Sequence, residues 1–221
     1  MIKKIVLLFI LTFCGVLFIP QLFTPSSSVV TVFRLTEDPI VIVRGVQGSA
    51  LTVDISFGDQ EVDKLLDQLT PTPPLLFVDM DWVTRFPLLV EKIKERSFPV
   101  ALLGAEGTLY EQDPEFIIQQ VKAFEEVFDT KPLWFRTVDE QFPQLLLQQL
   151  RTLEINALGS TIHWKGGNLP VKKEGEIISV PHHRKERINL HDLERLSSNR
   201  TFQSVEDLLF QPHIKTKKAP K

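Results

Sequence analysis

The sequence predicts an α/β fold in which parallel strands form one sheet and helices cover its outer side. Two observations lead to this class. Apolar, β-rich segments alternate with amphipathic segments of helical period, and five or more such units follow one another within about 170 residues. The pattern fits either a barrel or an open doubly wound sheet, and periodicity does not choose between them.

The first unit begins with a predicted strand at 49–55 (SALTVDI). Asp59 is expected to cap the helix that follows, because a carboxylate at this position accepts hydrogen bonds from free backbone N–H groups. The sequence TPTPP at 70–74 ends the helix, and LLFVDM at 75–80 is the next predicted strand. The apolar stripe of the helix comprises Val62, Leu65, Leu66 and Leu69.

The middle of the chain adds two more units. A helix is predicted from Pro87 to near Ser97, followed by a strand at 98–104 (FPVALLG). The dipeptide Asp113-Pro114 signals the next helix start, and LWFR at 133–136 is the fourth strand. The expected apolar stripes are Leu88, Leu89 and Ile93 in the first helix and Ile117, Val121, Phe124 and Phe128 in the second.

The last units complete the predicted domain, which covers residues 49–210. Pro143 is expected to open a helix that runs through Leu153. The remaining predicted elements are strands at 155–164 (INALGSTIHW) and 176–180 (EIISV) and a helical piece at 204–210 (SVEDLLF).

The segments outside this domain have other expected roles. Residues 1–23 carry Lys3 and Lys4 before an apolar run, which is the pattern of a signal peptide or of a single membrane anchor. Residues 24–48 are expected to form a tether and a β-rich segment, and 211–221 form a basic tail. The protein is therefore expected either at the cell membrane, held by its N-terminal segment with the domain outside, or secreted.

Composition limits the classes of partner and of chemistry. A net charge of −3 on 221 residues gives no reason to expect nucleic acid as a partner. Cys14 is the single cysteine and lies in the apolar N-terminal run. The predicted domain therefore has no disulfide, no thiol nucleophile and no thiolate metal ligand.

Polar residues follow several of the predicted strands. In a parallel α/β fold, binding and catalytic sites gather at the carboxyl ends of the strands. We therefore expect the polar residues at these ends to surround one common mouth. They are Asp54, Asp79, Asp81, Glu106, Arg136 and His163.

Five stretches, in order, resemble the motifs of one family. They are DISFGD (54–59), LLFVDMDWVTRFPLLVEKI (75–93), KPLWFR (131–136), STIHW (160–164) and EGEIISV (174–180). Over residues 40–185 the chain resembles the NodB-type polysaccharide deacetylases, carbohydrate esterase family 4, and most of all the sporulation-associated deacetylases of Gram-positive spore formers. The resemblance implies a distorted (β/α) barrel and a zinc-dependent attack of water on an acetyl group of a glycan.

The resemblance also implies roles for three candidate catalytic residues. It places Asp54 on the catalytic base, Arg136 on the arginine that keeps the base charged, and His163 on the aspartate that orients the catalytic histidine. That histidine aligns near Pro181, and His182, one place later, faces the opposite side of the strand. The pair of Asp54 and Arg136 has a second interpretation, as a structural ion pair.

The zinc ligands of the family are not kept. The resemblance places Ile55, Leu103 and Gly107 on the three ligand positions, and none of these side chains binds a metal. Because a zinc site needs at least three protein ligands, we expect no metal site and no resident cofactor. Asp79 and Asp81 are interpreted either as replacement ligands or as residues that start a helix.

Aromatic and histidine side chains offer further candidates. Trp82 and Trp164 are candidates for stacking on sugar rings, with packing in the core as the alternative. The stretch HHRKERINLH at 182–191 is interpreted either as a source of metal ligands or as a solvated loop or helix.

Three functions remain open on this reasoning. The favoured one is a catalytically degenerate, deacetylase-like domain that binds a glycan or a protein partner in the cell envelope. A divergent hydrolase would instead remove acetyl groups from an envelope glycan, such as peptidoglycan or a chitin-like polymer, at a rearranged site. A purely structural protein would have its mouth filled by apolar side chains such as Leu103. Whether the chain is an enzyme is thus an open question.

Overall fold

The structure is a computed structural model that describes residues 38–69 and 73–210. The chain divides into two compact units, residues 1–33 and 34–221, and only the second contains described residues. The predicted signal peptide or anchor at 1–23 and the basic tail at 211–221 lie outside the described residues. Among the helices that are described, none has the length and apolar character needed to cross a membrane.

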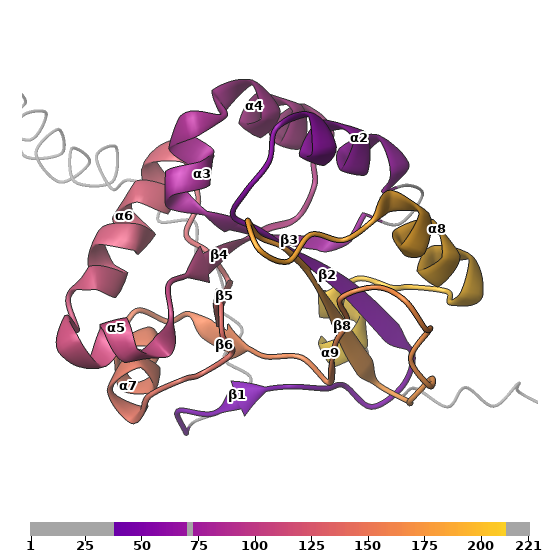
Figure 1. Ribbon diagram of the computed structural model, residues 1–221. Coiled ribbons are helices and arrows are strands. Elements are labelled where there is room, and N and C mark those ends of the chain that lie inside the picture. Colours follow the sequence, from indigo (N-terminus) through magenta and orange to yellow (C-terminus); the bar gives the residue numbers. More distant parts are fainter. Residues whose placement is uncertain (1–37, 70–72, 211–221) are drawn as a thin grey trace, which may run out of the picture. The chain divides into compact units, whose positions relative to one another are not determined.

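The strands within the described ranges form one parallel, eight-stranded sheet that curls into a half-barrel (Figure 1). Its order is β1-β6-β5-β4-β3-β2-β8-β7. The predicted α/β class is confirmed, and the curled sheet answers the question of barrel or open sheet in favour of the distorted barrel. The strands are β1 (Val41–Ile42), β2 (Ser49–Ile55), β3 (Leu75–Asp79), β4 (Val100–Gly104), β5 (Trp134–Thr137), β6 (Asn156–Leu158), β7 (Ile162–His163) and β8 (Glu176–His182).

Most of the described helices lie outside the curled sheet, as expected (Figure 1). Asp59 caps the first of them by accepting a hydrogen bond from the backbone N–H of Gln60. Leu88 departs from the prediction, because it is 84% exposed rather than part of a buried stripe. The helices are α2 (Gln60–Gln68), α3 (Met80–Arg85), α4 (Pro87–Glu95), α5 (Gly107–Gln112), α6 (Phe116–Phe128), α7 (Gln144–Thr152), α8 (Leu190–Asn199) and α9 (Val205–Phe210).

Two of these helices, α5 and α8, were not expected from the sequence, and α3 was anticipated only as a helix start at Asp79 or Asp81. α3 and α5 have six residues each, which is too short for a helical period to show. α8 lies in the strongly charged region that follows β8, and its buried side chains are only Leu193 and Leu196.

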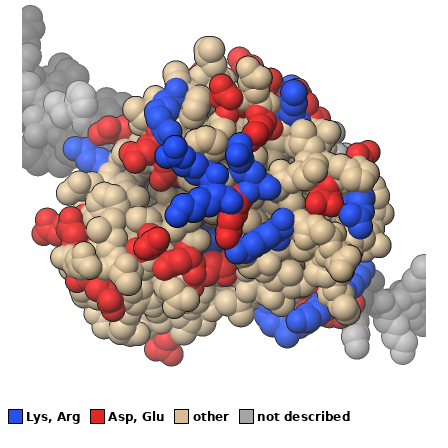
Figure 2. Space-filling view, in the orientation of Figure 1, with Lys and Arg blue, Asp and Glu red and all other residues tan. Residues whose placement is uncertain are grey.

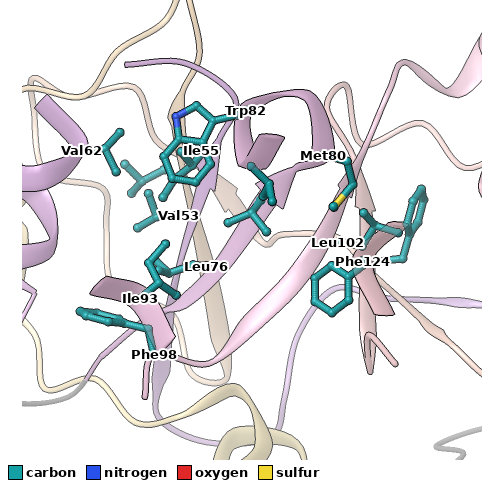
Figure 3. Packing of buried hydrophobic residues seen from close by; sticks show 14 of the residues in the cluster. Val53, Ile55, Val62, Leu76, Met80, Trp82, Ile93, Phe98, Leu102 and Phe124 are labelled. Atoms are coloured by element: carbon teal, nitrogen blue, oxygen red, sulfur yellow. The ribbon is translucent and has the colours of Figure 1, made fainter. Parts of the chain in front are cut away.

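Alternation along each strand divides the core into two clusters. On β2, Leu51, Val53 and Ile55 pack in the outer cluster, between sheet and helices, whereas Ala50 belongs to the inner cluster. Figure 3 shows part of the outer cluster, in which Trp82 lies close to Ile55. α9 is the exception among the helices, because its Val205 and Leu208 pack into the inner cluster.

The segment 155–164 is not one strand, which corrects the prediction. β6 pairs with β1 and β5, whereas β7 pairs with β8 at the other edge of the sheet. The three residues 159–161 connect them: Gly159 N–H donates to Ile42 O (2.8 Å) and Thr161 N–H donates to Ile177 O (2.9 Å). An apolar run shows that a segment is extended but not which neighbour it pairs with, so the sequence did not reveal this crossing.

The two edges of the sheet are also joined by the residues that follow β1. Arg44 forms an antiparallel bridge with Glu176, and Gly45 N–H donates to Gly175 O (2.8 Å). The segment 41–45 therefore contacts both edges of the sheet. β1 pairs with β6 at one edge, and Arg44 and Gly45 contact the start of β8 near the other. Of the segment 24–48, the structure describes residues 38–48, which contain β1, a strand of two residues that helps to close the barrel.

Candidate functional site

A buried ion pair lies at the centre of the candidate site. Asp54, on β2, accepts a hydrogen bond at Oδ1 from Arg136 Nη1 (2.8 Å) and one at Oδ2 from Ser179 Oγ (2.8 Å). Asp54 is 1% exposed and Arg136 is 0% exposed. The structure therefore brings together two of the three predicted catalytic residues, which lie on β2 and β5, and adds Ser179 from β8.

Arg136 uses its remaining donors on the barrel itself. Nη1 also donates to Thr52 Oγ1 (2.7 Å), Nε to Leu158 O (2.9 Å) and Nη2 to Gly159 O (3.1 Å). Its guanidinium carbon lies 4.3 Å from the centre of the Phe77 ring. These contacts reach β2, β3 and β6, so the guanidinium links strands across the inside of the barrel.

A second set of polar groups forms the rim above this pair. His163 Nδ1 lies 3.3 Å from Ser179 Oγ and 3.8 Å from Glu140 Oε1. Glu140 accepts hydrogen bonds from Ser160 N–H (2.8 Å) and Ser160 Oγ (2.7 Å). His163, the third predicted catalytic residue, thus reaches Asp54 only through the hydroxyl of Ser179, and its side chain is partly exposed.

Glu140 is held in its charged form. Burial alone would raise the pKa of this carboxyl, but the neighbouring His163, the charge of Arg136 and the hydrogen bonds from Ser160 together lower the pKa to about 2. At neutral pH the rim therefore carries a fixed negative charge beside His163.

His183, considered from the sequence only as a possible metal ligand, makes a contact at the site that the sequence reasoning did not assign. Its Nδ1 lies 2.7 Å from Ser56 Oγ, at the end of β2. Burial lowers the pKa of His183, while the charges of Asp54 and Glu186 act in the opposite sense. Strand alternation could have identified this residue, because positions 179, 181 and 183 share one face of the strand, and Ser179 faces Asp54.

The stretch 182–191 is not a simple solvated segment. His182 is buried and His183 is half-buried, because β8 extends two residues beyond the predicted strand and a tight turn follows it. In this turn His183 N–H donates to Glu186 O (2.7 Å). His191 alone of the three histidines is exposed, on the first turn of α8.

The residues at the family's ligand positions do not fit a zinc ion. Ile55 packs in the outer cluster and Leu103 in the inner cluster. At Gly107, a Cβ atom would lie 2.4 Å from the backbone oxygen of Gln141, so a larger side chain has no room. Within the described part of the chain, no three His, Cys, Asp or Glu side chains are placed to hold a metal.

Asp79 has the helix-start role that was one of its two interpretations. Its Oδ1 accepts a hydrogen bond from Trp82 N–H (2.9 Å), which caps α3. Burial raises the pKa of Asp79. Asp81 follows in the first turn of α3 and is exposed.

The two tryptophans predicted to stack on sugar rings are packed in the protein instead. Trp82 is 0% exposed and its Nε1 donates to Gly58 O (2.7 Å). Trp164 is 5% exposed and its Nε1 donates to Asn168 O (3.0 Å). Because neither indole presents a free face, the core-packing alternative describes both residues.

Charge is unevenly distributed on the face of the molecule seen in Figure 2. Lys and Arg side chains gather in the middle of this face, where the segment after β8 runs in Figure 1, and acidic side chains lie toward α5. The basic residues of that segment include Arg184, Lys185 and Arg187, all exposed. The described residues as a whole carry 18 Lys or Arg and 27 Asp or Glu, a net charge of −9, so this basic region is local.

Comparison with known proteins gives matches in structure but not in sequence. No protein-family model and no curated protein matches the chain. A carbohydrate esterase family 4 pseudoenzyme from Bacillus anthracis matches with a TM-score of 0.65 and 14% identity, over 77% of this chain and 69% of that one.

Two structures from Bacillus subtilis match as well. The family 4 carbohydrate esterase PdaA of Bacillus subtilis has a TM-score of 0.61 and 14% identity, over 77% of this chain and 85% of that one. The peptidoglycan deacetylase PdaC of Bacillus subtilis has a TM-score of 0.60 and 16% identity, over 77% and 91%. Together with the curled parallel sheet, these matches show that the chain has the fold of the family 4 polysaccharide deacetylases, a distorted (β/α) barrel.

Proposed function

We propose that this chain is a deacetylase-like domain of the cell envelope that binds a glycan and does not remove acetyl groups from it. The observation that carries the proposal is that Asp54 is buried and hydrogen-bonded within the protein. Both of its carboxylate oxygens are hydrogen-bonded within the protein, and the residue is 1% exposed.

A general base must lie within hydrogen-bond reach of the proton that it accepts. Asp54 meets Arg136 and Ser179 instead of solvent, and the described residues offer no ligand set for a metal that would activate a water molecule. The pair of Asp54 and Arg136 is therefore assigned a structural role. Its replacement by apolar side chains would require both partners to change together, since either charge alone would be buried without its counterpart.

The rim above the pair supports the binding part of the proposal. His163, Glu140 and Ser160 present imidazole, carboxylate and hydroxyl groups at the carboxyl ends of the strands, where ligands bind in folds of this kind. Such groups suit the hydroxyl and amide groups of an N-acetylated sugar. The similar structures include peptidoglycan deacetylases and a pseudoenzyme, which favours an envelope glycan as the ligand.

The location is part of the same proposal. Residues 1–23 have the sequence pattern of a signal peptide or of an N-terminal anchor, which would bring the domain to the outer side of the membrane. A domain in that position would meet the cell-wall glycan directly. Export into the medium and retention at the membrane are both compatible with this function.

Co-sedimentation with insoluble peptidoglycan and with chitin tests the binding. The full chain, purified in mild detergent, is expected to pellet with at least one of the two polymers. His163→Ala should reduce the pelleted fraction several-fold, and His191→Ala, which changes an exposed histidine on α8, should not. A chain that stays in the supernatant with both polymers, or equal pelleting of the two variants, would contradict the proposed function.

One observation favours the divergent hydrolase as the alternative. Ser56 Oγ lies 2.7 Å from His183 Nδ1, and burial lowers the pKa of His183, which leaves this imidazole neutral and able to accept the hydroxyl proton. Acetate release without added metal, lost in both Ser56→Ala and His183→Ala, would establish this alternative in place of the binding function.

A further inference from the structure

Two surface segments lie side by side at the end of the barrel where β2 and β8 begin. Residues 43–48 lead into β2, and residues 171–175 lead into β8. Arg44 Nη2 donates a hydrogen bond to Glu174 O (2.7 Å), and Gly48 N–H donates one to Glu174 Oε2 (3.3 Å). These bonds hold the two segments together, so that their exposed side chains form one surface.

This surface carries exposed aliphatic side chains. Val171 is 81% exposed, Val46 is 65% exposed and Val43 is 44% exposed. Among the large apolar residues of the described chain, only Leu88 on α4 is as exposed as Val171 and Val46. Scattered apolar residues are common on protein surfaces, but these three lie in two neighbouring segments.

The same surface is basic. Three cations and one carboxylate, Glu174, give the two segments a net charge of +2, whereas the described residues as a whole carry −9. Figure 2 shows basic side chains at the lower right of the molecule, where these segments run in Figure 1. We call the exposed apolar and basic residues of the two segments the basal surface; they are Val43, Arg44, Val46, Val171, Lys172 and Lys173.

We propose that the basal surface contacts an anionic lipid membrane and thereby turns the mouth of the barrel toward the cell-wall glycan. This inference rests on the membrane-anchored form of the proposed function.

The two kinds of side chain suit the two layers of a membrane surface. Lys and Arg are attracted to anionic lipid head groups, and each contributes a modest amount. Exposed valines can enter the boundary between head groups and acyl chains, as the apolar side chains of interfacial proteins do. An anionic wall polymer would also attract the cations, but it would leave the valines in water. The combination therefore favours a lipid surface.

A weak contact is sufficient for a domain that is already held at the membrane. Residues 24–37 would join an anchor at 1–23 to Asp38, the first described residue. These 14 residues span at most about 50 Å when fully extended. Tethering at this distance raises the effective concentration of the membrane surface around the domain, so that contacts too weak for a free protein become populated.

The basal surface lies at the opposite end of the strands from the mouth of the barrel. β2 and β8 begin beside the basal surface and end at the mouth, at Ile55 and His182. Each has seven residues and is therefore about 20 Å long. With the basal surface on the membrane, the mouth and its rim would face away from the membrane, toward the wall. The contact would in this way present the glycan-binding side of the domain to its ligand.

Fluorescence quenching in vesicles tests the contact. The full chain, with Cys14→Ser to remove its single cysteine, is labelled with a fluorophore at Val171→Cys or at Lys185→Cys, an exposed position in the turn that follows β8. Each chain is reconstituted into vesicles of phosphatidylcholine and phosphatidylglycerol that carry a nitroxide quencher on their head groups. We expect the label at 171 to be quenched and the label at 185 to keep its fluorescence. Equal quenching at the two positions, or none at 171, would overturn the proposal.

Charge variants show whether the contact is electrostatic. Quenching at 171 should weaken as salt is added and in vesicles of phosphatidylcholine alone. Lys172→Gln with Lys173→Gln should lower the ratio of quenched to unquenched label about 25-fold, since each lysine favours contact with an anionic surface about five-fold. Lys64→Gln with Lys122→Gln, which removes two exposed lysines from α2 and α6, should leave the ratio unchanged. Equal ratios in the two double variants would contradict the assignment.

No glycan is present in this measurement, so the two proposals can fail independently. Loss of peptidoglycan binding with quenching intact would contradict the proposed function alone. Binding of peptidoglycan without quenching at 171 would contradict only the membrane contact.

Discussion

At the scale of single residues, exposure to solvent decides whether Asp54 and Arg136 form a catalytic pair or a structural ion pair. Asp54 and Arg136 are 82 positions apart, and the sequence motifs placed them together correctly. The motifs did not show that Ser179 occupies the second carboxylate oxygen, or that the pair is sealed. Burial depends on side chains from several strands at once, and no single motif contains that information.

The structural role of Arg136 predicts a large loss of stability on its removal. Arg136→Met leaves Asp54 buried without its cation, so the free energy of unfolding should fall by about 3–5 kcal/mol. Urea denaturation followed by circular dichroism measures this. Arg96→Met is the control, because Arg96 pairs with Asp67 at the surface and its loss should cost under about 1 kcal/mol. Similar losses in the two variants would show that the buried pair is not structural.

The lowered pKa of Glu140 predicts a pH-dependent contribution to stability. The pKa is about 2 in the folded chain and 4.5 for the free side chain, so the stabilisation is present above about pH 5 and is lost as the pH falls toward 2. Relative to the unaltered chain, Glu140→Gln should lose about 3 kcal/mol at pH 7 and progressively less below pH 4.5.

Urea denaturation of both chains between pH 7 and pH 3 gives the comparison. Glu186→Gln is the control, since the Glu186 carboxylate pairs with Lys165 at an exposed position and its loss should have a small effect throughout. A difference between Glu140→Gln and the unaltered chain that does not change with pH would contradict the assignment.

At the scale of elements, the sequence predicted features set by residues near one another in the chain, such as caps and strand positions. It missed features that depend on which strands pair in the sheet. The cap at Asp59, the strand at 49–55 and the helix after Pro143 agree with the structure. The split of 155–164 into β6 and β7 was missed, because the sequence shows one continuous extended segment while the partners of the two strands lie toward opposite edges of the sheet. The role of His183 was missed for a related reason, since β8 runs further than its apolar residues suggest.

Closure of the barrel edges depends on Gly175. This residue has φ of +69°, and a Cβ atom on it would lie 2.1 Å from the backbone oxygen of Gly45. Gly175→Ala should therefore lower the free energy of unfolding by more than about 2 kcal/mol and increase hydrogen exchange in the segment 41–46.

Gly167→Ala provides a matched control for that substitution. Gly167 also has a positive φ, +81°, but a Cβ atom there would have nothing within 4 Å. Its replacement should cost only the backbone strain, about 1 kcal/mol, and should leave exchange in 41–46 unchanged. Equal effects of the two alanine substitutions would mean that the contact between Gly175 and Gly45 does not hold the edges together.

At the scale of the whole molecule, the fold and the chemistry of the site have separate determinants. The fold rests on alternation of apolar residues in strands and helices, which is why it could be predicted and why it is shared with the esterase PdaA at 14% identity. The metal-dependent chemistry of family 4 would rest on a few side chains at positions that here hold Ile55, Leu103 and Gly107. Two of these pack in the hydrophobic clusters and the third has no room for a side chain.

The central claim is that this barrel binds glycan without deacetylating it, and acetate release tests it most directly. The full chain is incubated with peptidoglycan and with N-acetylglucosamine oligomers, with zinc or cobalt added and with chelator, beside an active family 4 esterase as the positive control. The account predicts no acetate above the protein-free blank in any condition. Metal-dependent release by this chain, lost in Asp54→Asn, would contradict it and would make the buried carboxylate a catalytic base.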